Sequence, residues 1–432
     1  MNDKIHKIVT VYKRDGFIET TKKIYKHIKY TVFFKHNPLY LIDFVFKKNK
    51  YKNDLNNIFN KKYDRIIIWR GSFGWNVPLF QRPQHIAREL SKQNCLVLYA
   101  TYKDDKILTY KYVYDNLFLI NFENKQFNKL LNKFISNSSI PKYIQLYSTD
   151  WFKSVLDIKK FISSGYKILY EYIDDLHPAL TGTKDLAKNI VDKYKFCSEN
   201  TNDVIVVTTA DKLYNDVYMV RKDKNLIFSG NGVEYEHFID IKNENDINKK
   251  MIDIIKLKKP IIGYYGALAK WFDYDLIKYI AFKKPEYEIV LIGLKYDTSF
   301  DLSKIEKISN VHYLGVIDYI DLPKYIKKMD IMTIPFLIND ITKATSPCKL
   351  FEYMSASKPI VTTDLNECRK YKSVMIGKTK EEFVLLLDKA FDIIKKNDKK
   401  YFTLLKNEAL ANTWKAKAEL IIKGLEKSEK TR

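Results

Sequence analysis

A basic and an acidic side chain stand one helical turn apart in the segment TSPCKLFEYMSASKPIV, residues 345–361. The segment opens with the pattern of a helix start, with Ser346 expected as the cap and Pro347 in the first turn. Lys349 adds a cation to a helix end whose unpaired N–H groups already carry roughly half a positive charge. This combination predicts an anion site, and phosphate is the commonest biological anion at such a position.

Glu352 follows Lys349 by three positions, about 60° further around the helix. A carboxylate there can accept two hydrogen bonds from a vicinal diol such as ribose O2 and O3. Leu350, Phe351 and Met354 are expected to pack against a sheet and hold the turn in place. The alternative is a solvated Lys–Glu pair, which stabilises a helix by only tenths of a kcal/mol.

Two adjacent carboxylates, Asp174 and Asp175, follow the apolar run KILYEYI. Like-charge proximity raises the pKa of one member of such a pair toward the range of a general base. Asp175 is therefore the candidate base for a substrate hydroxyl, and the alternative is an ordinary helix cap. Another acidic pattern, DYD at 273–275, matches the Asp–x–Asp manganese motif but opens a helix, whereas a metal-bridging pair should end a strand. Metal-independent chemistry is expected.

The elements that must position these residues alternate from Asp64 onward, with short apolar, β-branched runs separated by helical stretches. Continuous apolar runs of this length are typical of strands buried on both faces of a parallel sheet. Two consecutive sets predict two doubly wound α/β domains, whose ligands bind outside the carboxyl ends of the strands. The runs are RIIIWR, CLVLYAT, YIQLYS, KILYEYI, VIVVTTA and NLIFSGNGV, then PIIGYYGA, EIVLIGL, VHYLGV, DIMTIPF and PIVTTD.

Composition is consistent with two domains and an anionic partner. The 432 residues are 46% apolar and carry a net charge of +23, of which residues 1–62 hold +10 and residues 395–432 hold +6. Such an excess favours phosphates, nucleic acid or an acidic membrane surface. The four cysteines are far apart and lack a CxxC pair, so neither a zinc site nor a disulfide framework is expected and a reducing cytoplasm fits best.

The first 60 residues do not join the alternating pattern. IETTKKIYKHIKY predicts a basic helix, and three interpretations stay open: a helical layer packed on the domain, a membrane-surface helix, or a poorly ordered basic arm. Anionic lipid attracts basic segments by about 1 kcal/mol per charge near the surface. No secretory signal is expected at the start, and YTVFFKHNPLYLIDFVF is too interrupted to span a bilayer.

The segment 346–361 resembles the nucleotide-binding segment of GT-B glycosyltransferases of the type grouped with family 4. WNVPLFQRPQHIARELSKQNCLVLYAT resembles the first β–α unit of bacterial surface-polysaccharide transferases, with its QRPQH signature. GNGVEYEHF is similar to the end of the family's N-terminal domain, and IIGYYGALAKWFDYDLI to the first strand and helix of its donor domain. NTWKAKAELI resembles the closing helix, so the resemblance runs over about residues 63–420.

This resemblance implies a GT-B architecture, two Rossmann-like domains facing a cleft, preceded here by a basic helical extension. The expected parts are the extension at 1–62, an acceptor domain at 63–235, a nucleotide-sugar donor domain at 236–405 and a closing helix at 406–432. The resemblance further implies donor-binding roles for a set of residues, with Glu352 on the ribose and the helix start on the diphosphate: Gly266, Lys270, Ser346, Lys349, Leu350 and Glu352.

Gly266 would let the backbone approach the diphosphate where a side chain would block it. Two departures from the family's pattern stand out. Ala344 replaces the first of two glutamates eight positions apart, and GALAK replaces Gly–Arg–Leu, which removes an arginine from the phosphates. Lys349 and Lys270 are expected to share that duty, although neither has the bidentate fork of arginine.

The acceptor is expected on the N-terminal domain, at Trp75, Arg82 and His85 in the loop GSFGWNVPLFQRPQH and the helix that follows it. For His85 the alternative is a helix-start histidine bonded to its own loop. Related transferases carry a similar Asp–Asp, which supports Asp175 as the base.

The expected function is a hexosyltransferase-type glycosyltransferase without cofactor or metal. It would move a sugar from a nucleotide diphosphate donor, UDP-linked, to a glycan or lipid-linked acceptor in cell-surface polysaccharide or capsule biosynthesis. The expected location is cytoplasmic and peripheral on the inner membrane face, with contact to anionic lipid through the basic termini and none to nucleic acid. Alternatives are a UDP-sugar epimerase of the same fold, a non-catalytic sugar-nucleotide-binding protein and a nucleic-acid binder.

Overall fold

The computed structural model describes residues 37–71, 73–77, 80–101, 107–150, 153–176, 185–241, 243–297, 299 and 307–430. Contacts divide the chain into two compact units. Unit 1 comprises Met1–Val77 and Ser91–Tyr143, and unit 2 comprises Pro78–Leu90 and Ile144–Arg432. The basic helix expected at residues 18–30 lies outside the described residues.

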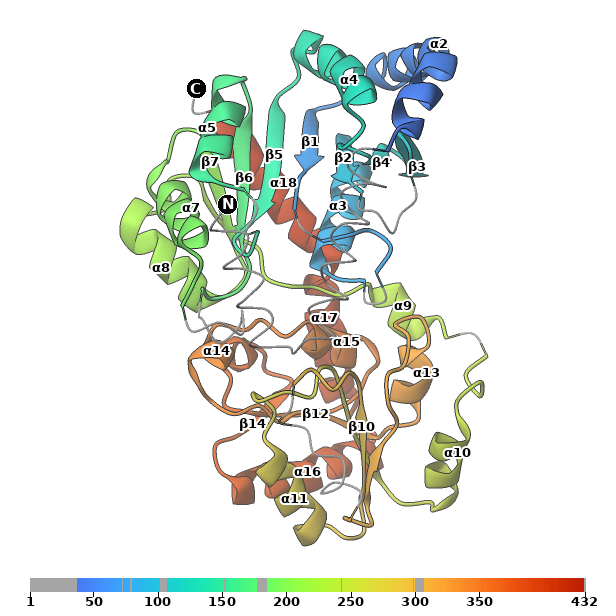
Figure 1. The fold of residues 1–432 in the computed structure, drawn as a ribbon. Coiled ribbons are helices and arrows are strands. Elements are labelled where there is room, and N and C mark those ends of the chain that lie inside the picture. The colour runs from blue at the N-terminus through green and yellow to red at the C-terminus, as the bar shows by residue number, and fades with distance from the viewer. Residues whose placement is uncertain are drawn as a thin grey trace, which may run out of the picture. The chain divides into compact units, whose positions relative to one another are not determined.

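The first sheet has eight strands in the order β3-β4-β2-β1-β5-β6-β7-β8 (Figure 1). Strands β2, β4, β7 and β8 pair in parallel with their neighbours, and β3 pairs antiparallel with β4. The strands are β1 (Arg65–Trp69), β2 (Cys95–Ala100), β3 (Tyr110–Tyr114), β4 (Leu117–Ile120), β5 (Lys142–Tyr147), β6 (Lys167–Tyr172), β7 (Val204–Thr208) and β8 (Leu226–Phe228).

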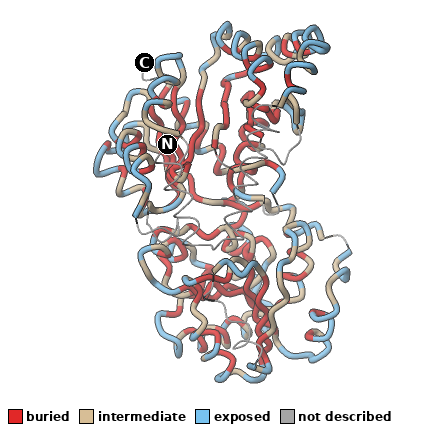
Figure 2. Tube along the Cα trace, viewed as in Figure 1, coloured by how far each residue is buried: buried red, intermediate tan, exposed pale blue. Residues whose placement is uncertain are grey.

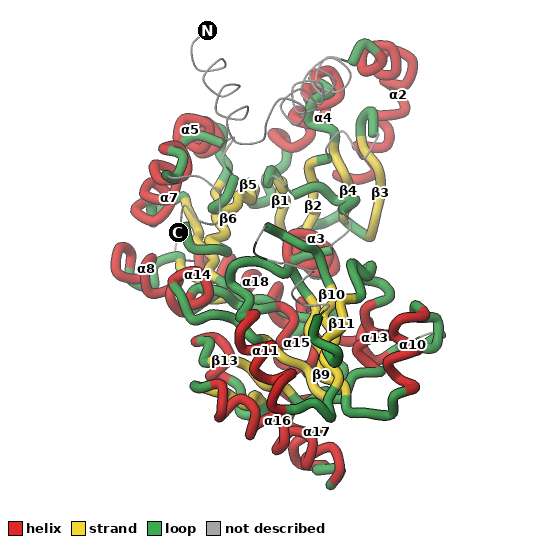
Figure 3. The backbone as a smooth tube through the Cα atoms, turned by 60° about the horizontal axis from the view of Figure 1, so that its bottom comes forward, coloured by secondary structure: helices red, strands yellow, loops and turns green. Residues whose placement is uncertain are grey.

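The second sheet lies within unit 2 and has six strands in the order β11-β10-β9-β12-β13-β14, joined by parallel pairs (Figure 3). Its strands are β9 (Ile261–Tyr265), β10 (Glu288–Ile292), β11 (Val311–Tyr313), β12 (Ile331–Ile334), β13 (Ile360–Thr363) and β14 (Val374–Gly377).

All eleven apolar runs of the sequence form strands, and most of these strands are buried along their whole length (Figure 2). Burial on both faces removes the polar alternation that a half-exposed strand would show. The sequence reading missed β3, β4 and β14. Edge strand β3 is half exposed and mixes lysine with tyrosine, so its pattern does not indicate a buried strand.

The helices include the expected α11 and α13. The bounds are α2 (Leu39–Phe59), α3 (Arg82–Lys92), α4 (Lys125–Asn137), α5 (Val155–Ser163), α7 (Lys188–Glu199), α8 (Asp211–Arg221), α9 (Tyr235–Ile239), α10 (Lys249–Lys256), α11 (Tyr274–Lys283), α13 (Leu322–Lys327), α14 (Asp340–Lys343), α15 (Cys348–Ser355), the 3₁₀ helix η3 (Asn366–Lys370), α16 (Lys380–Lys395), α17 (Lys399–Ala411) and α18 (Trp414–Lys430).

The last helix ties the end of the chain to the first sheet. Helix α18 packs against β7 and β8, and the Ser229 hydroxyl donates to the Lys417 carbonyl at 3.0 Å. Strands β6–β8 therefore belong to the same compact unit as the second sheet, although they are part of the first sheet. The boundaries at residues 62, 235 and 405 stay predictions.

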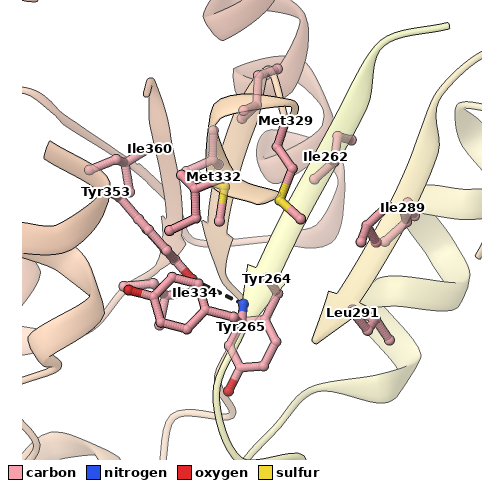
Figure 4. Packing of buried hydrophobic residues seen from close by; sticks show 14 of the residues in the cluster. Ile262, Tyr264, Tyr265, Ile289, Leu291, Met329, Met332, Ile334, Tyr353 and Ile360 are labelled. Atoms are coloured by element: carbon pink, nitrogen blue, oxygen red, sulfur yellow. Dashed lines mark hydrogen bonds between the residues drawn. The ribbon is translucent and has the colours of Figure 1, made fainter. Parts of the chain in front are cut away.

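A continuous apolar core surrounds the second sheet. Gly263 in β9 makes room for sulfur, because an added Cβ would overlap Met329 Sδ and lie 2.8 Å from Met332 Sδ (Figure 4). Helix α15 packs against β13 and α17, and α16 covers the strands β12 to β14. The strand ends that carry the site are therefore fixed by close packing on both sides.

Within the described parts of the chain, no helix is both long enough and apolar enough to cross a membrane.

Candidate active site

Helix α15 begins at Cys348, with Pro347 at the N-cap position and no capping side chain. The sequence reading that Ser346 caps this helix is wrong. Pro347 has extended backbone angles (φ −75°, ψ 113°), and the Ser346 hydroxyl and carbonyl instead accept hydrogen bonds from Asn231 at 3.4 and 2.7 Å. Lys349 is therefore the second helical residue, inside the turn where backbone N–H groups lack intrahelical partners.

The Lys349 side chain lies against the end of β9. Its Nζ is 5.1 Å from the ring centre of Phe336 and 5.8 Å from that of Tyr264. Desolvation by these surroundings lowers the pKa of Lys349. The aromatic faces attract the ammonium, but the site also removes its water. An anionic ligand beside it would favour the protonated form and so raise its pKa.

The backbone of Gly266 lies beside this cation. Its φ of +141° is rare for residues with a side chain, and an added Cβ would lie 2.8 Å from Lys349 Cε. Gly293, at the end of the neighbouring β10, also has a φ of +141°, and a Cβ there would overlap the Gly266 carbonyl. The sequence reading found Gly266 and missed Gly293, although both end an apolar strand with glycine.

Glu352 lies one turn beyond Lys349 and accepts a hydrogen bond from the Tyr265 hydroxyl. Burial raises the pKa of Glu352 to about 7, although Tyr265 and Lys349 act in the opposite direction. The Tyr265 amide is itself bonded to the Tyr353 hydroxyl at 3.3 Å (Figure 4). The carboxyl group is thus held by a strand residue, and it is poised to change charge near neutral pH.

Unit 2 contains a cavity of about 420 Å³, and both Lys349 and Asp175 line it. Its aromatic side is formed by Tyr264, Trp271, Tyr296 and Phe336, none of which the sequence reading selected. Aromatic faces and carboxylates together suit a sugar, which presents both C–H faces and hydroxyls. The lining residues are Thr149, Asp174, Asp175, Leu176, Leu186, Ile190, Tyr264, Ala267, Trp271, Tyr296, Phe336, Ile341, Thr342, Thr345 and Lys349.

Asp175 in this cavity is held by Lys212 of α8, whose Nζ is 2.9 Å from Asp175 Oδ2. The Tyr172 hydroxyl donates to the other carboxylate oxygen at 3.3 Å. Desolvation at the cavity wall, and then the charge of Asp175, raise the pKa of Asp174. The pKa increase therefore falls on Asp174, and burial contributes more to it than the like charge of its neighbour does.

Two of the predicted acceptor-binding residues are engaged inside the protein. Arg82 is buried, with Nε 2.6 Å from Glu171 and Nη1 donating to the Gly230 carbonyl at 2.8 Å. Trp75 is buried in unit 1, where its ring meets those of Tyr99 and Tyr114 edge-on. These contacts explain both residues as packing and positioning groups, because neither side chain presents a face to solvent.

His85, the third of them, is also buried. It stacks on Trp414 with ring centres 5.0 Å apart and an angle of 10°, and its Nδ1 lies 3.9 Å from Glu234. Its amide donates to the Gln81 carbonyl at 3.1 Å and its ring meets that of Phe80 edge-on, so the alternative of a histidine bonded to its own loop holds beside the contacts from distant segments. An acceptor role for these three residues stays a prediction that the geometry does not favour.

The other predicted residues divide by exposure. Leu350 is fully buried in the core, so only its backbone could meet a ligand. Lys270 is exposed and lies outside the cavity lining, with its amide donating to Asp297 at 3.0 Å. Asp273 caps α11 by accepting from the Leu276 amide, and Asp275 pairs with Lys278, so both carboxylates of DYD serve helix α11.

The sequence predicts a nucleotide diphosphate beside Gly266, and on that prediction Gly266→Ala is expected to abolish measurable UDP binding, because the new Cβ would displace Lys349. The strain of a side chain at this φ is expected to lower stability by about 1–3 kcal/mol. Gly315→Ala is the matched control, since Gly315 has a φ of +82° and nothing within 4 Å of an added Cβ. Calorimetry should show that the control loses stability but retains UDP affinity. Equal UDP affinity in both variants would contradict the assignment.

Two doubly wound domains of this kind, with a site at the strand ends, define the GT-B class. Solved structures confirm that fold. Anabaena Alr3699/HepE, solved with UDP and glucose, matches with a TM-score of 0.55 and 12% identity over 84% of this chain and 100% of that one. WaaG, described as a glycosyltransferase of lipopolysaccharide biosynthesis, matches at 0.53 and 12% over 82% and 97%. The trehalose-6-phosphate synthase OtsA matches at 0.60 and 11% over 84% and 99%.

Residues 259–392 match the family described as "Glycosyl transferases group 1". This part of the chain is therefore similar to a glycosyltransferase group 1 domain, and the fold is GT-B. A curated relative, TuaH of Bacillus subtilis (strain 168), is 27% identical over 202 residues and carries a provisional name as a teichuronic acid biosynthesis glycosyltransferase. The match covers 45% of this chain and 49% of TuaH, so it spans about half the length of that relative. The predicted resemblance to surface-polysaccharide transferases is confirmed.

Proposed function

We propose that this protein is a glycosyltransferase that moves a sugar from a UDP-linked donor to a glycan or lipid-linked acceptor in cell-surface polysaccharide synthesis. The observation that carries the proposal is the convergence of Lys349, the uncapped start of α15 and the side-chain-free backbone of Gly266 on one point. The relative's name supports the polysaccharide class, and the UDP of the solved neighbour supports the nucleotide.

The donor diphosphate would bind at the start of α15. Backbone N–H groups and the Lys349 ammonium are already oriented there, so they need no rearrangement when negative charge develops on the departing diphosphate. The bond that breaks joins the anomeric carbon to the diphosphate oxygen, and the bond that forms joins that carbon to the acceptor oxygen. The aromatic side of the cavity would pack on the sugar.

Asp175 would take the proton from the acceptor hydroxyl. It lines the same cavity as Lys349, which allows one substrate assembly to reach both groups. The Lys212 ammonium would orient this carboxylate, since its Nζ lies 2.9 Å from Asp175 Oδ2. Asp175 is accordingly the proposed catalytic base, and Lys212 is its positioning residue.

Glu352 would bind the two ribose hydroxyls in place of its present partner, the Tyr265 hydroxyl. Substituting Glu352→Gln is expected to weaken UDP binding roughly tenfold to a hundredfold, because hydrogen bonds to a charged group are lost. Since the pKa of Glu352 is raised to about 7, the carboxylate form grows as the pH rises from 6 to 8. The ratio of wild-type to Glu352→Gln affinity, measured by calorimetry, should therefore increase over that interval. A ratio near one throughout would remove the ribose role.

A panel of nucleotide sugars, screened for thermal stabilisation, tests the proposed function as a whole. A ligand that binds only the folded protein raises its melting temperature. At a hundredfold excess over its Kd, it adds about 2.7 kcal/mol to the free energy of unfolding. UDP-sugars are expected to stabilise the protein more than ADP- or GDP-sugars. Absence of stabilisation by every nucleotide sugar would contradict the proposal.

The proposed location is the cytoplasmic face of the cell membrane, with peripheral attachment. The charge distribution supports it, because residues 1–62 and 395–432 hold +16 of the net +23. A lipid-linked acceptor would place the substrate at the same surface, where anionic headgroups attract basic segments.

A further inference from the structure

Helix α2 is fixed to unit 1 by one face. Tyr51 and Leu55 are buried on that face, and the Tyr51 ring meets Phe127 of α4 edge-on at 5.4 Å. The Tyr110 hydroxyl of β3 donates to Asp54 at 2.7 Å. These contacts hold the helix in a defined rotation about its own axis, which determines the side chains that face outward.

The opposite face of its first two turns is apolar and exposed. Leu39, Ile42, Val45 and Phe46 are exposed by 52%, 51%, 64% and 84%. At about 100° per residue, these four positions fall within an arc of about 120°. Neighbouring Leu41 is 55% exposed as well. Leaving large apolar side chains in water forgoes about 1.5–3 kcal/mol each relative to burial, so a cluster of this kind indicates a binding surface.

The charge next to this face identifies the occupant. Residues 1–62 carry a net +10, and Lys48, Lys50 and Lys52 follow the face in the next two turns and are exposed, as is Lys47, which pairs with Asp43. An exposed apolar face bordered by lysines matches the boundary between acyl chains and anionic headgroups.

We propose that α2 is a membrane-docking helix, with Leu39, Ile42, Val45 and Phe46 inserted below the headgroups of an anionic bilayer and the following lysines on its phosphates. The proposal rests on the proposed function for its biological purpose, which is access to a lipid-linked acceptor. It goes beyond that function because it attributes membrane binding to insertion of an apolar helix face, rather than to charge alone.

The test uses the full chain and vesicles of phosphatidylcholine with phosphatidylglycerol. The variant Ile42→Ser/Val45→Ser/Phe46→Ser is expected to lower vesicle affinity by at least roughly tenfold. Phe282→Ser is the matched control, because Phe282 is 79% exposed and belongs to α11 rather than to α2. High salt should weaken wild-type binding without abolishing it, since insertion of apolar side chains is not screened. The triple variant should lose its residual binding completely under the same conditions.

Three outcomes would overturn the proposal. One is unchanged vesicle affinity in the triple variant. Another is a lowered melting temperature with unchanged vesicle affinity, which would show that another part of the chain covers the face. The third is a wild-type dimer that the triple variant converts to monomer, which would assign the face to a second copy. UDP calorimetry on the same samples separates this proposal from the proposed function. UDP affinity should be equal in wild type and variants. If no sample bound UDP, the proposed function would fail, but the vesicle result would still test membrane docking.

Discussion

Asp175→Asn is expected to lower turnover by roughly 10²–10⁴-fold, the range that general-base catalysis contributes. Asparagine has nearly the same shape and can still contact Lys212, which lies 2.9 Å from the native carboxylate. The amide cannot accept a proton from the acceptor hydroxyl at neutral pH. UDP affinity should be unchanged, because the substitution leaves the proposed diphosphate and ribose groups in place.

Asp216→Asn is the control for this experiment. Asp216 also pairs with Lys212, at 3.1 Å, but it lies outside the lining of the cavity that holds Asp175. The control should retain most of the activity. A fall of the same size in both variants would show that Lys212 and its ion pairs act structurally, and near-normal turnover of Asp175→Asn would remove it as the base.

Lys349→Met is expected to lower turnover by roughly 10²–10³-fold, the effect of removing one preorganised group that stabilises developing negative charge. Methionine fills a similar volume among Phe336 and Tyr264 without a charge. Because desolvation lowers the pKa of Lys349, replacing this ammonium by an apolar side chain should leave the melting temperature unchanged or raise it. Loss of activity together with retained or increased stability is the signature of a group kept for function.

Lys343→Met tests whether any nearby lysine has the same effect. Lys343 ends α14, is exposed and pairs with Asp340 at 3.3 Å. It should tolerate the substitution with little change in turnover or UDP affinity. Turnover of Lys349→Met close to that of this control would contradict the diphosphate assignment.

The candidate anion-binding segment could be selected from the sequence because it is local. A helix start, a lysine in its first turn and a glutamate three positions later lie within seven residues, and helical geometry alone places them together. The error over Ser346 is instructive. Its hydroxyl is used by Asn231, 115 positions away in the chain, so no local capping preference could anticipate it.

The same reason explains why the sequence did not show how two of the predicted acceptor residues are held. Arg82 and His85 have the side chains of a binding site and follow a strand end, but their partners Glu171 and Trp414 come from remote segments. Nothing in the loop itself distinguishes a guanidinium that faces a substrate from one that neutralises a buried carboxylate.

The amino-acid sequence by itself indicated eleven of the fourteen strands in the described residues, because uninterrupted apolar runs separated by amphipathic stretches are typical of parallel strands flanked by helices. It also selected Lys349, Gly266 and Glu352 as candidates for a donor site. The tertiary structure alone decided that Gly293 packs against Gly266, that Tyr265 holds Glu352, and that aromatic side chains from several strands' ends meet Asp175 around one cavity. These contacts join positions tens to hundreds of residues apart, and their geometry depends on how whole layers pack.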